Sequence, residues 1–430
     1  MSEALFSKLA AIVGAQHLAI GAPAAVDGVA PRFLARPADV GQVSRLLACA
    51  HAEGLTVVPR GAGTALGLGH PPARVDLLLD LARLDRVVEY EPADVTVSVE
   101  AGMTLHELAQ VLGKHRQFLP LDPPAWRART VGGVLATNAS GPLRFRYGTG
   151  RDVLLGVRFV QADGSITWGG AKVVKSVTGY DIPKLLTGSL GTLGVIVETT
   201  LRLHPVPDAE RAWLFGFASL GAAQGLVAAI LDSTLQPSRL EIMNAAALAA
   251  LGQPPAAAGV AVSVASVEEA VRDQGETLAR LAAGAGGAAR PLGEDFWDAY
   301  GPAITRTVDS LRLRIACLAG SAAATVAAIE ALARERRVTA RVAGSAGVGA
   351  LTAVLEGAGL EWQARVLEPL RERLAGEGGS VVVEQCPRAL KDSIDVWGPI
   401  DPPVLALTKR IKTEFDPKGV LNPGRFVGRL

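Results

Sequence analysis

Short apolar runs, several of them with alternating polar residues, recur through the first half of the chain. Residues 55–59 (LTVVP), 75–81 (VDLLLDL) and 95–102 (VTVSVEAG) have the length and the β-branched content of strands. The tripeptide DGS at 163–165 indicates a hairpin turn. The capping box at 104–107 predicts the start of a helix. Further strands are predicted at 86–91, 156–170 and 194–205.

The pattern changes near Pro205 and Pro207. Beyond them, long Ala-rich stretches such as 216–231 and 321–337 predict helices that are separated by a few strands. The low-complexity stretch 281–291 (LAAGAGGAARP) predicts a flexible connector. A chain of 430 residues commonly divides into more than one folded unit, so two units with a boundary near 207 are expected.

Composition narrows the classes of partner and location. The formal net charge of +1 argues against a nucleic-acid partner held by charge. Residues 242–267 carry no charge, but Pro254 and Pro255 at their centre disfavour a membrane-spanning helix. The N-terminus lacks the features of a signal peptide, so a soluble cytoplasmic protein is predicted. Three separated cysteines, Cys49, Cys317 and Cys386, cannot ligate an iron–sulfur cluster within this chain.

A glycine-rich loop at 61–69 follows the strand predicted at 55–59. A dinucleotide-binding fingerprint is one interpretation, with Asp80 near the ribose position, but that motif requires a helix directly after the loop. Residues 66–74 (LGLGHPPAR) cannot form this helix because glycine and proline interrupt it. The remaining interpretations are a plain turn or a row of bare backbone N–H groups that bind phosphate oxygens, with Thr64 as an extra donor.

Two more loops of the same character favour the second interpretation. Residues 129–156 contain GG and TNASG, and residues 179–194 contain GSLGTLG before a strand. Any one of these loops alone could be a hairpin connection. Three of them, each beside an apolar run, are predicted to line one long polar cofactor.

These segments carry a resemblance to a known family. PRGAGT at 59–64, LPLDPP at 119–124 with TVGGVLATNASG at 130–141, and GYDIPKLLTGSLGTLG at 179–194 resemble the FAD-binding domain of the vanillyl-alcohol-oxidase type, also called the PCMH type. Within that family the chain, including its tail from 397 to 430, is most similar to one of the FAD-binding subunits of bacterial glycolate oxidase. The resemblance implies an α+β, two-lobed fold with an α+β cap domain.

The resemblance also implies domains and a cofactor. Residues 1–207 would form the FAD-binding domain, 208–385 the cap or substrate domain, and 386–430 a segment that returns to the first domain. Some relatives attach FAD covalently through a histidine in the first glycine loop, where this chain has Ala62, so non-covalent FAD is expected. The residues implied to bind FAD are Pro59, Arg60, Gly61, Ala62, Gly63, Thr64, Pro123, Thr130, Gly132, Gly133, Thr137, Asn138, Gly141, Tyr147, Gly148, Gly188, Gly191, Thr192, Gly194, Val195 and Asn422.

The implied activity is FAD-dependent oxidation of a CH–OH group, from glycolate to glyoxylate. In related D-lactate and D-2-hydroxyglutarate dehydrogenases, histidines of the second domain serve a metal and the substrate hydroxyl. This chain has no histidine after His204, so no metal site is predicted and the catalytic base is left unassigned. Arg388 and Lys391 are candidates for binding a substrate carboxylate, against the commoner interpretation of a solvated basic face. Arg144 and Arg146 are candidates for binding FAD phosphates or a partner.

Three functional alternatives stay open. The chain is an FAD-binding subunit that oxidises a small hydroxy acid within a complex. Alternatively, it is a free-standing dehydrogenase of another small hydroxy acid or alcohol, or a flavin-bearing relay or scaffold subunit without substrate turnover. The expected partners are a second FAD subunit and an iron–sulfur subunit, and through them the inner face of the cell membrane.

Overall fold

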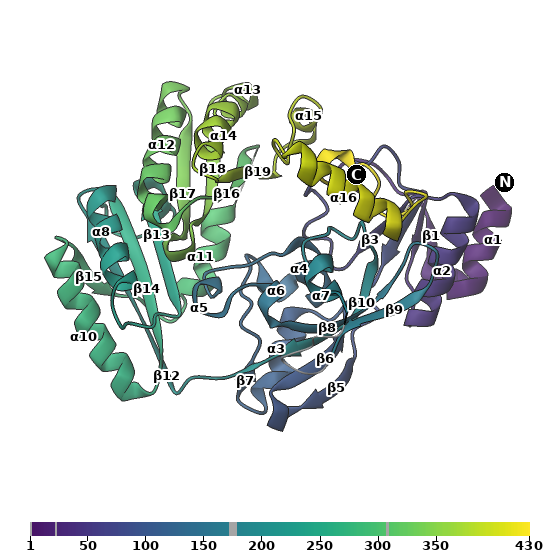
Figure 1. Cartoon of the computed structure of the whole chain (residues 1–430), viewed down its shortest axis with the longest axis horizontal. Coiled ribbons are helices and arrows are strands. Elements are labelled where there is room, and N and C mark those ends of the chain that lie inside the picture. The colour runs from purple at the N-terminus through teal and green to yellow at the C-terminus, as the bar shows by residue number, and fades with distance from the viewer. Residues whose placement is uncertain (1, 22–23, 172–178, 307–308) are drawn as a thin grey trace.

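The computed structural model describes residues 2–21, 24–171, 179–306 and 309–430. Figure 1 shows two lobes: strands and helices of the N-terminal half on the right, and an extended sheet with its helices on the left. The C-terminal segment, drawn in yellow, crosses from the left lobe to lie over the right one. No helix in the described part of the chain is long and apolar enough to cross a membrane.

The N-terminal lobe begins with a small four-stranded sheet in the order β1-β2-β4-β3, in which β4 runs parallel to both β2 and β3. Helices α1 and α2 cover it through a core that includes Leu9, Leu46 and Leu77. Asp39 caps α2, and Gly54 ends that helix in the left-handed conformation. The elements are α1 (Ser2–Val13), β1 (Leu18–Ile20), β2 (Phe33–Ala35), α2 (Val40–Glu53), β3 (Val57–Arg60) and β4 (Leu77–Asp80).

A five-stranded antiparallel sheet in the order β5-β6-β10-β8-β9 completes this lobe. The capping box at Thr104 and Glu107 begins α3 as predicted, and Gly164 makes the hairpin turn between β8 and β9. The elements are β5 (Val87–Glu91), β6 (Thr96–Glu100), α3 (Leu105–Gly113), α4 (Val131–Thr137), α5 (Arg144–Tyr147), α6 (Gly150–Val153), β8 (Leu154–Val160), β9 (Ile166–Gly170), α7 (Ile182–Leu186) and β10 (Val195–Arg202), with β7 (Gln117–Phe118) paired to β11 (His204–Pro205).

The cap lobe is an eight-stranded sheet in the order β15-β12-β14-β13-β17-β18-β16-β19. One face is apolar and packs against helices α8, α10, α12 and α14. Alternate residues point to the opposite face, which α9 and α11 cover in part. The elements are β12 (Ala209–Phe217), α8 (Leu220–Leu231), β13 (Arg239–Asn244), α9 (Ala245–Ala250), β14 (Ala258–Ser266), α10 (Glu268–Gly284), β15 (Ala288–Pro291), α11 (Phe296–Thr305), β16 (Leu311–Ala316), α12 (Ala322–Glu335), β17 (Thr339–Ser345), β18 (Ala350–Glu356), α13 (Leu360–Ala364), α14 (Leu367–Ala375) and β19 (Ser380–Gln385).

The expected flexible connector at 281–291 is wrong. Its first four residues are the last turn of α10, where Ala282 is buried against the sheet, and Ala288–Pro291 forms the edge strand β15. The Ala- and Gly-rich composition suggested a linker, but small residues also allow a helix to lie close to a sheet.

The C-terminal segment packs against the N-terminal lobe. After α15 (Arg388–Lys391) and α16 (Pro402–Phe415), Leu421 forms a parallel β-bridge with Val57, next to β3. Inside this contact the Lys412 ammonium donates to Thr192 O, Leu421 O and the Asp416 carboxylate. The tail therefore completes the edge of the four-stranded sheet that leads into the first glycine loop.

Candidate functional site

The first glycine loop presents unpaired backbone N–H groups. Within the described residues, the amides of residues 61–65 have no hydrogen-bond partner. Gly63 has φ of +80°, a conformation that side chains rarely adopt and that turns successive N–H groups to one side. Such an array, directly after β3, has the chemistry of a phosphate-binding nest.

Two buried cations hold the carbonyl groups on the other side of this loop. Arg425 donates to the backbone oxygens of Leu66 and Leu68, and Lys391 donates to those of Gly67 and Gly69. Lys391 is also paired with Asp27 at 2.7 Å. Arg425 and Lys391 of the C-terminal segment thus hold the loop in place through its carbonyl groups at 66–69. The backbone N–H groups of residues 61–65 are not used in these contacts.

A small cavity of about 90 Å³ lies where the loop meets the start of α4 and the 190–196 segment. The close approach requires glycine: a Cβ on Gly61 would lie 2.1 Å from Thr130 Oγ1, and one on Gly191 would lie 2.8 Å from Pro59 Cγ. The implied FAD residues that line this cavity are Pro59, Arg60, Gly61, Ala62, Gly63, Thr64, Thr130, Gly132, Gly133, Thr137, Gly191, Gly194, Val195 and Asn422.

A larger cavity of about 880 Å³ lies between the lobes and shares Thr137 and Leu190 with the first. Its walls include Pro123, Asn138, Gly141 and Gly188, again from the implied set. The two spaces therefore lie next to each other and share part of their wall, as the sites for two parts of one long cofactor would. The glycine cradle and the free amides fit FAD in this respect.

Three implied residues line neither cavity. The Tyr147 ring makes edge-on contacts with two other rings, and its centroid lies 5.7 Å from that of Phe118 and 4.9 Å from that of His204. Gly148 ends α5 with φ of +79°. Thr192 is buried, and its hydroxyl donates to Ser189 O at 2.7 Å. These residues support the walls, and a direct contact with FAD stays a prediction.

The candidate carboxylate ligands of the C-terminal stretch lie elsewhere. Lys391 is buried in the ion pair with Asp27, and Arg388 pairs with Asp392 at 3.2 Å on the surface. Neither lines a cavity. Arg146 likewise donates to Gln236 O, whereas its neighbour Arg144 lines the large cavity.

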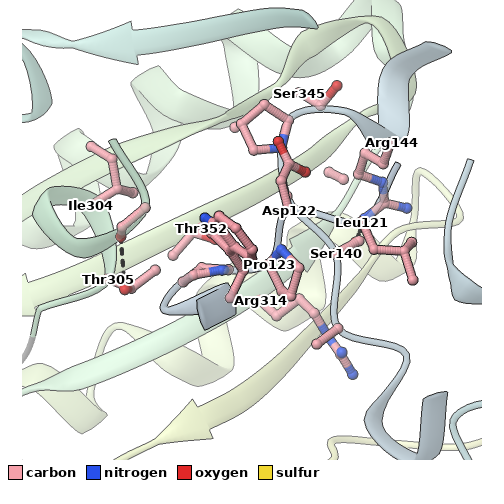
Figure 2. Close-up of a pocket in the computed structure, with 18 of the residues that line it drawn as sticks. Leu121, Asp122, Pro123, Ser140, Arg144, Ile304, Thr305, Arg314, Ser345 and Thr352 are labelled. Atoms are coloured by element: carbon pink, nitrogen blue, oxygen red, sulfur yellow. Dashed lines mark hydrogen bonds between the residues drawn. The ribbon is translucent and has the colours of Figure 1, made fainter. Parts of the chain in front are cut away.

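The cap contributes the polar wall of the large cavity. The sequence LRLRIA in β16 alternates, so that Leu311, Leu313 and Ile315 enter the apolar core while Arg312 and Arg314 face the cavity. Figure 2 shows Arg314, Ser345 and Thr352 of the cap strands around the same space as Arg144 and Asp122 of the first lobe. The alternation of apolar residues and arginines in β16 is visible in the sequence. The sequence does not show which residues of the first lobe lie across the cavity from these arginines.

The charges in this cavity are unevenly paired. Arg127 bonds Asp298 at 2.8 Å, Arg312 lies 2.9 Å from Glu384, and Arg239 lies 3.5 Å from Asp122. Within the described residues, in contrast, no ion pair is formed by Arg129, Arg144 or Arg314, and Arg129 donates to Pro124 O at 2.7 Å. Arg144 donates to the Ser140 hydroxyl at 3.2 Å, and burial lowers its pKa.

One buried acid faces the same cavity. Glu241 on β13 is 2% exposed and accepts a hydrogen bond of 2.6 Å from the Tyr300 hydroxyl of α11. Burial raises the pKa of Glu241 to about 8. Sequence reasoning missed this pair because its members lie 59 residues apart on a strand and a helix. The cavity thus combines three arginines that form no ion pair within the described residues with a largely neutral acid, which suits an anionic ligand.

Two family models match the chain. Residues 31–170 match an FAD binding domain, and residues 399–426 match the FAD linked oxidases, C-terminal domain. An uncharacterised FAD-linked oxidoreductase of Mycobacterium tuberculosis is 29% identical over 93% of this chain and 91% of its own length. The glycolate oxidase subunit GlcD of Bacillus subtilis is 30% identical over 50% of this chain, and the match spans less than half, 46%, of that relative.

Solved structures give the fold. The crystal structure of p-cresol methylhydroxylase superposes with a TM-score of 0.77 at 16% identity, covering 98% of this chain and 96% of the other. The α+β, PCMH-type fold with two lobes and a cap is therefore confirmed. The chain is thus similar to FAD-linked oxidoreductases over most of its length, and two of its segments match FAD-linked family models.

Proposed function

We propose that this FAD-linked oxidoreductase oxidises a small 2-hydroxy acid, with glycolate as the simplest member, to the 2-oxo acid. Support comes from the glycolate oxidase relative and from a cavity whose unpaired cations suit a carboxylate. The carrying observation is that Arg144 and Arg314 enter one cavity from different lobes and form no ion pair with any residue that the structure describes.

In this proposal, different residues of the two cavities would bind the cofactor and the substrate. The amides of residues 61–65 would hold the FAD pyrophosphate, and the small cavity and the adjoining walls would hold the rest without a covalent bond. Among the described residues that line the two cavities there is no histidine, which favours non-covalent FAD. When bound, FAD supplies the two-electron acceptor for the C2 hydrogen of the substrate. Arg144 and Arg314 would bind the carboxylate and orient the hydroxyl carbon.

The electrons must then leave the flavin. The three cysteines of this chain are free and far apart in sequence, so an iron–sulfur centre would belong to another subunit. We therefore include in the proposal a complex with a second FAD subunit and an iron–sulfur subunit, with any membrane contact made through them. A relay subunit without its own turnover is the alternative, and the absence of histidine after His204 is the observation that favours it.

A visible spectrum of the purified full chain tests the proposal. Yellow protein that loses its flavin absorbance anaerobically with glycolate, D-lactate or D-2-hydroxyglutarate, but not with acetate, is expected. Acetate is the matched control because it offers a carboxylate and no oxidisable hydroxyl. Yellow protein that none of these acids bleaches would support the relay alternative, and colourless protein that takes up no FAD would contradict both. Acid precipitation should release the flavin, since no covalent bond is expected.

A further inference from the structure

We infer that Glu241 is the catalytic residue that accepts the hydroxyl proton of the substrate, and that Tyr300 positions its carboxylate. This inference rests on the proposed function, because it assigns the base for that reaction. Glu241 and Tyr300 both line the large cavity that Arg144 and Arg314 enter.

The two carboxylate oxygens of Glu241 differ in their contacts. Oε2 accepts the Tyr300 hydroxyl at 2.6 Å, whereas Oε1 is buried and has no hydrogen-bond partner within the described residues. Ser345 stands directly opposite Glu241 in the β13–β17 ladder, and its buried hydroxyl lies close enough to lower the pKa of the Glu241 carboxyl. A buried carboxylate oxygen without a well-formed hydrogen bond costs about 1–3 kcal/mol, so Oε1 is the Glu241 atom that a substrate hydroxyl would stabilise most.

The fold fixes this carboxylate firmly. Leu240 and Ile242 bury the other face of β13 in the cap core, and Tyr300 is 5% exposed on α11 beside Phe296 and Trp297. A hydroxyl donor on a packed helix therefore sets the direction of Oε2. Burial raises the pKa of Tyr300 well above its ordinary value, so this hydroxyl keeps its proton and acts as a donor.

The charges around Glu241 come from every wall. Burial is the largest cause that raises the pKa of Glu241, and the negative charge of Asp122 raises it further. Three causes lower it: the hydrogen bond from Tyr300, the positive charge of Arg144 and the hydroxyl of Ser345. The result, a pKa of about 8, is suited to a general base because it lies near neutral pH. Arg239, on the same strand, is already paired with Asp122 and Glu210.

The step balances with the cofactor that the proposed function names. The substrate O–H bond breaks and its proton goes to Glu241 Oε1. The C2–H hydrogen would leave with its electron pair to the two-electron acceptor that FAD supplies, while a C=O bond forms at C2. The products are a 2-oxo acid, a protonated Glu241 and reduced FAD, and the proton then leaves to solvent.

Anaerobic flavin reduction across about pH 6 to pH 10 tests the assignment in the full-length, FAD-loaded protein. The rate for the natural chain should rise with pH and level off above about pH 8. Glu241→Gln should reduce its flavin about 10²- to 10⁴-fold more slowly, with no rise over this range. Tyr300→Phe should move the rise to higher pH, because the lost hydrogen bond favours the carboxylate, and a merely structural role would not produce this shift.

Two further measurements separate the role of Glu241 from folding and cofactor binding. Glu241→Gln should keep its FAD content and its affinity for acetate, measured by the change in flavin absorbance. The infrared difference spectrum between acid and alkaline pH should show a carboxylic acid that titrates near pH 8 and is missing in Glu241→Gln. Glu372→Gln, on the exposed side of α14, is the matched control and should behave as the natural chain.

The failures are distinguishable. If the natural chain is bleached by a 2-hydroxy acid and Glu241→Gln is bleached at the same rate with the same pH profile, the base assignment is overturned and the proposed function stands. If no 2-hydroxy acid bleaches the natural chain, the proposed function is overturned and the assignment with it.

Discussion

The glycines of the candidate site are required for different physical reasons. Gly61 and Gly191 let one backbone segment approach another, since a Cβ at either would meet Thr130 or Pro59 below 3.0 Å. Gly133 differs, because its Cβ would meet only the Thr130 hydroxyl, at 3.0 Å, on the cavity side of α4. Substitutions at these positions therefore report on packing in the first case and on cofactor space in the second.

Gly133→Val should give folded protein with little bound FAD. Its branched side chain would enter the small cavity that the cofactor is expected to occupy, while the rest of α4 keeps its buried contacts. The ratio of flavin to protein absorbance measures the effect. Gly67→Ala is the control, because a Cβ there has no atom within 4 Å and FAD content should be unchanged. Full FAD occupancy in Gly133→Val would show that α4 does not border the cofactor.

Arg314→Met should raise the KM for a 2-hydroxy acid about 10- to 100-fold, the size expected for one charge-assisted contact to a carboxylate. Methionine preserves much of the side-chain volume, and Arg314 has no ion pair within the described residues whose loss could destabilise the cap. Steady-state kinetics with an artificial acceptor give the KM. Arg334→Met, on the exposed last turn of α12, is the control. An unchanged KM in Arg314→Met would remove this residue from the carboxylate site.

At the scale of elements, the sequence predicts what is local. The strands at 57–60, 77–80 and 96–100 follow from apolar runs, and the capping box at Thr104 specifies the start of α3. The stretch 281–291 was wrongly expected to be a connector, because the sheet that buries Ala282 is assembled from distant strands. The same distance hid Glu241 and Tyr300: alternation shows that β13 has two faces, but only the folded sheet shows what each face meets.

The contact between the tail and the first glycine loop gives an element-scale prediction. Arg425 is buried, donates to Leu66 O, Leu68 O and Asn422 Oδ1, and keeps its charge at neutral pH although burial lowers its pKa to about 10. Arg425→Met would leave these acceptors unpaired and should lower the free energy of unfolding by about 2–4 kcal/mol. It should also weaken FAD binding, because the loop loses its outer support.

Urea unfolding and FAD titration measure the two effects of Arg425→Met. Arg429→Met serves as the matched control because Arg429 is exposed four residues later in the same tail. Stability and FAD affinity equal to those of the natural chain would show that the loop keeps its shape without the clamp.

At the scale of the whole molecule, the two halves of the candidate site differ in how far sequence can predict them. The cofactor half lies on three glycine loops, each recognisable within about a dozen residues, and 14 of the implied residues line the small cavity. The substrate half exists only where the cap sheet faces the first lobe, so its arginines and its acid are brought together by tertiary packing. Motifs therefore indicated the cofactor but left the base unassigned.

The burial of Glu241 in the cap should affect how the free energy of unfolding depends on pH. The folded pKa of Glu241, about 8, lies above its ordinary value of 4.5, so the folded chain holds a proton that the unfolded chain has released between these values. Stability from this group is therefore full below about pH 4.5 and is lost as the pH rises through 8. Glu241→Gln, which cannot ionise, should lose less stability over this window.

The difference between the two chains should grow with pH and reach on the order of 5 kcal/mol near pH 9, measured by urea unfolding at a series of pH values. Parallel curves would mean that Glu241 is already ionised in the folded chain at neutral pH. The carboxylate would then be hydrated or paired, and the cap would not close over it as tightly as the buried Tyr300 contact requires. Because the folded state stores this cost at the cavity wall, binding of a hydroxyl to Oε1 should offset part of it. A saturating concentration of a substrate analogue that carries a hydroxyl should therefore reduce the difference in free energy of unfolding between the natural chain and Glu241→Gln. Acetate should reduce this difference less.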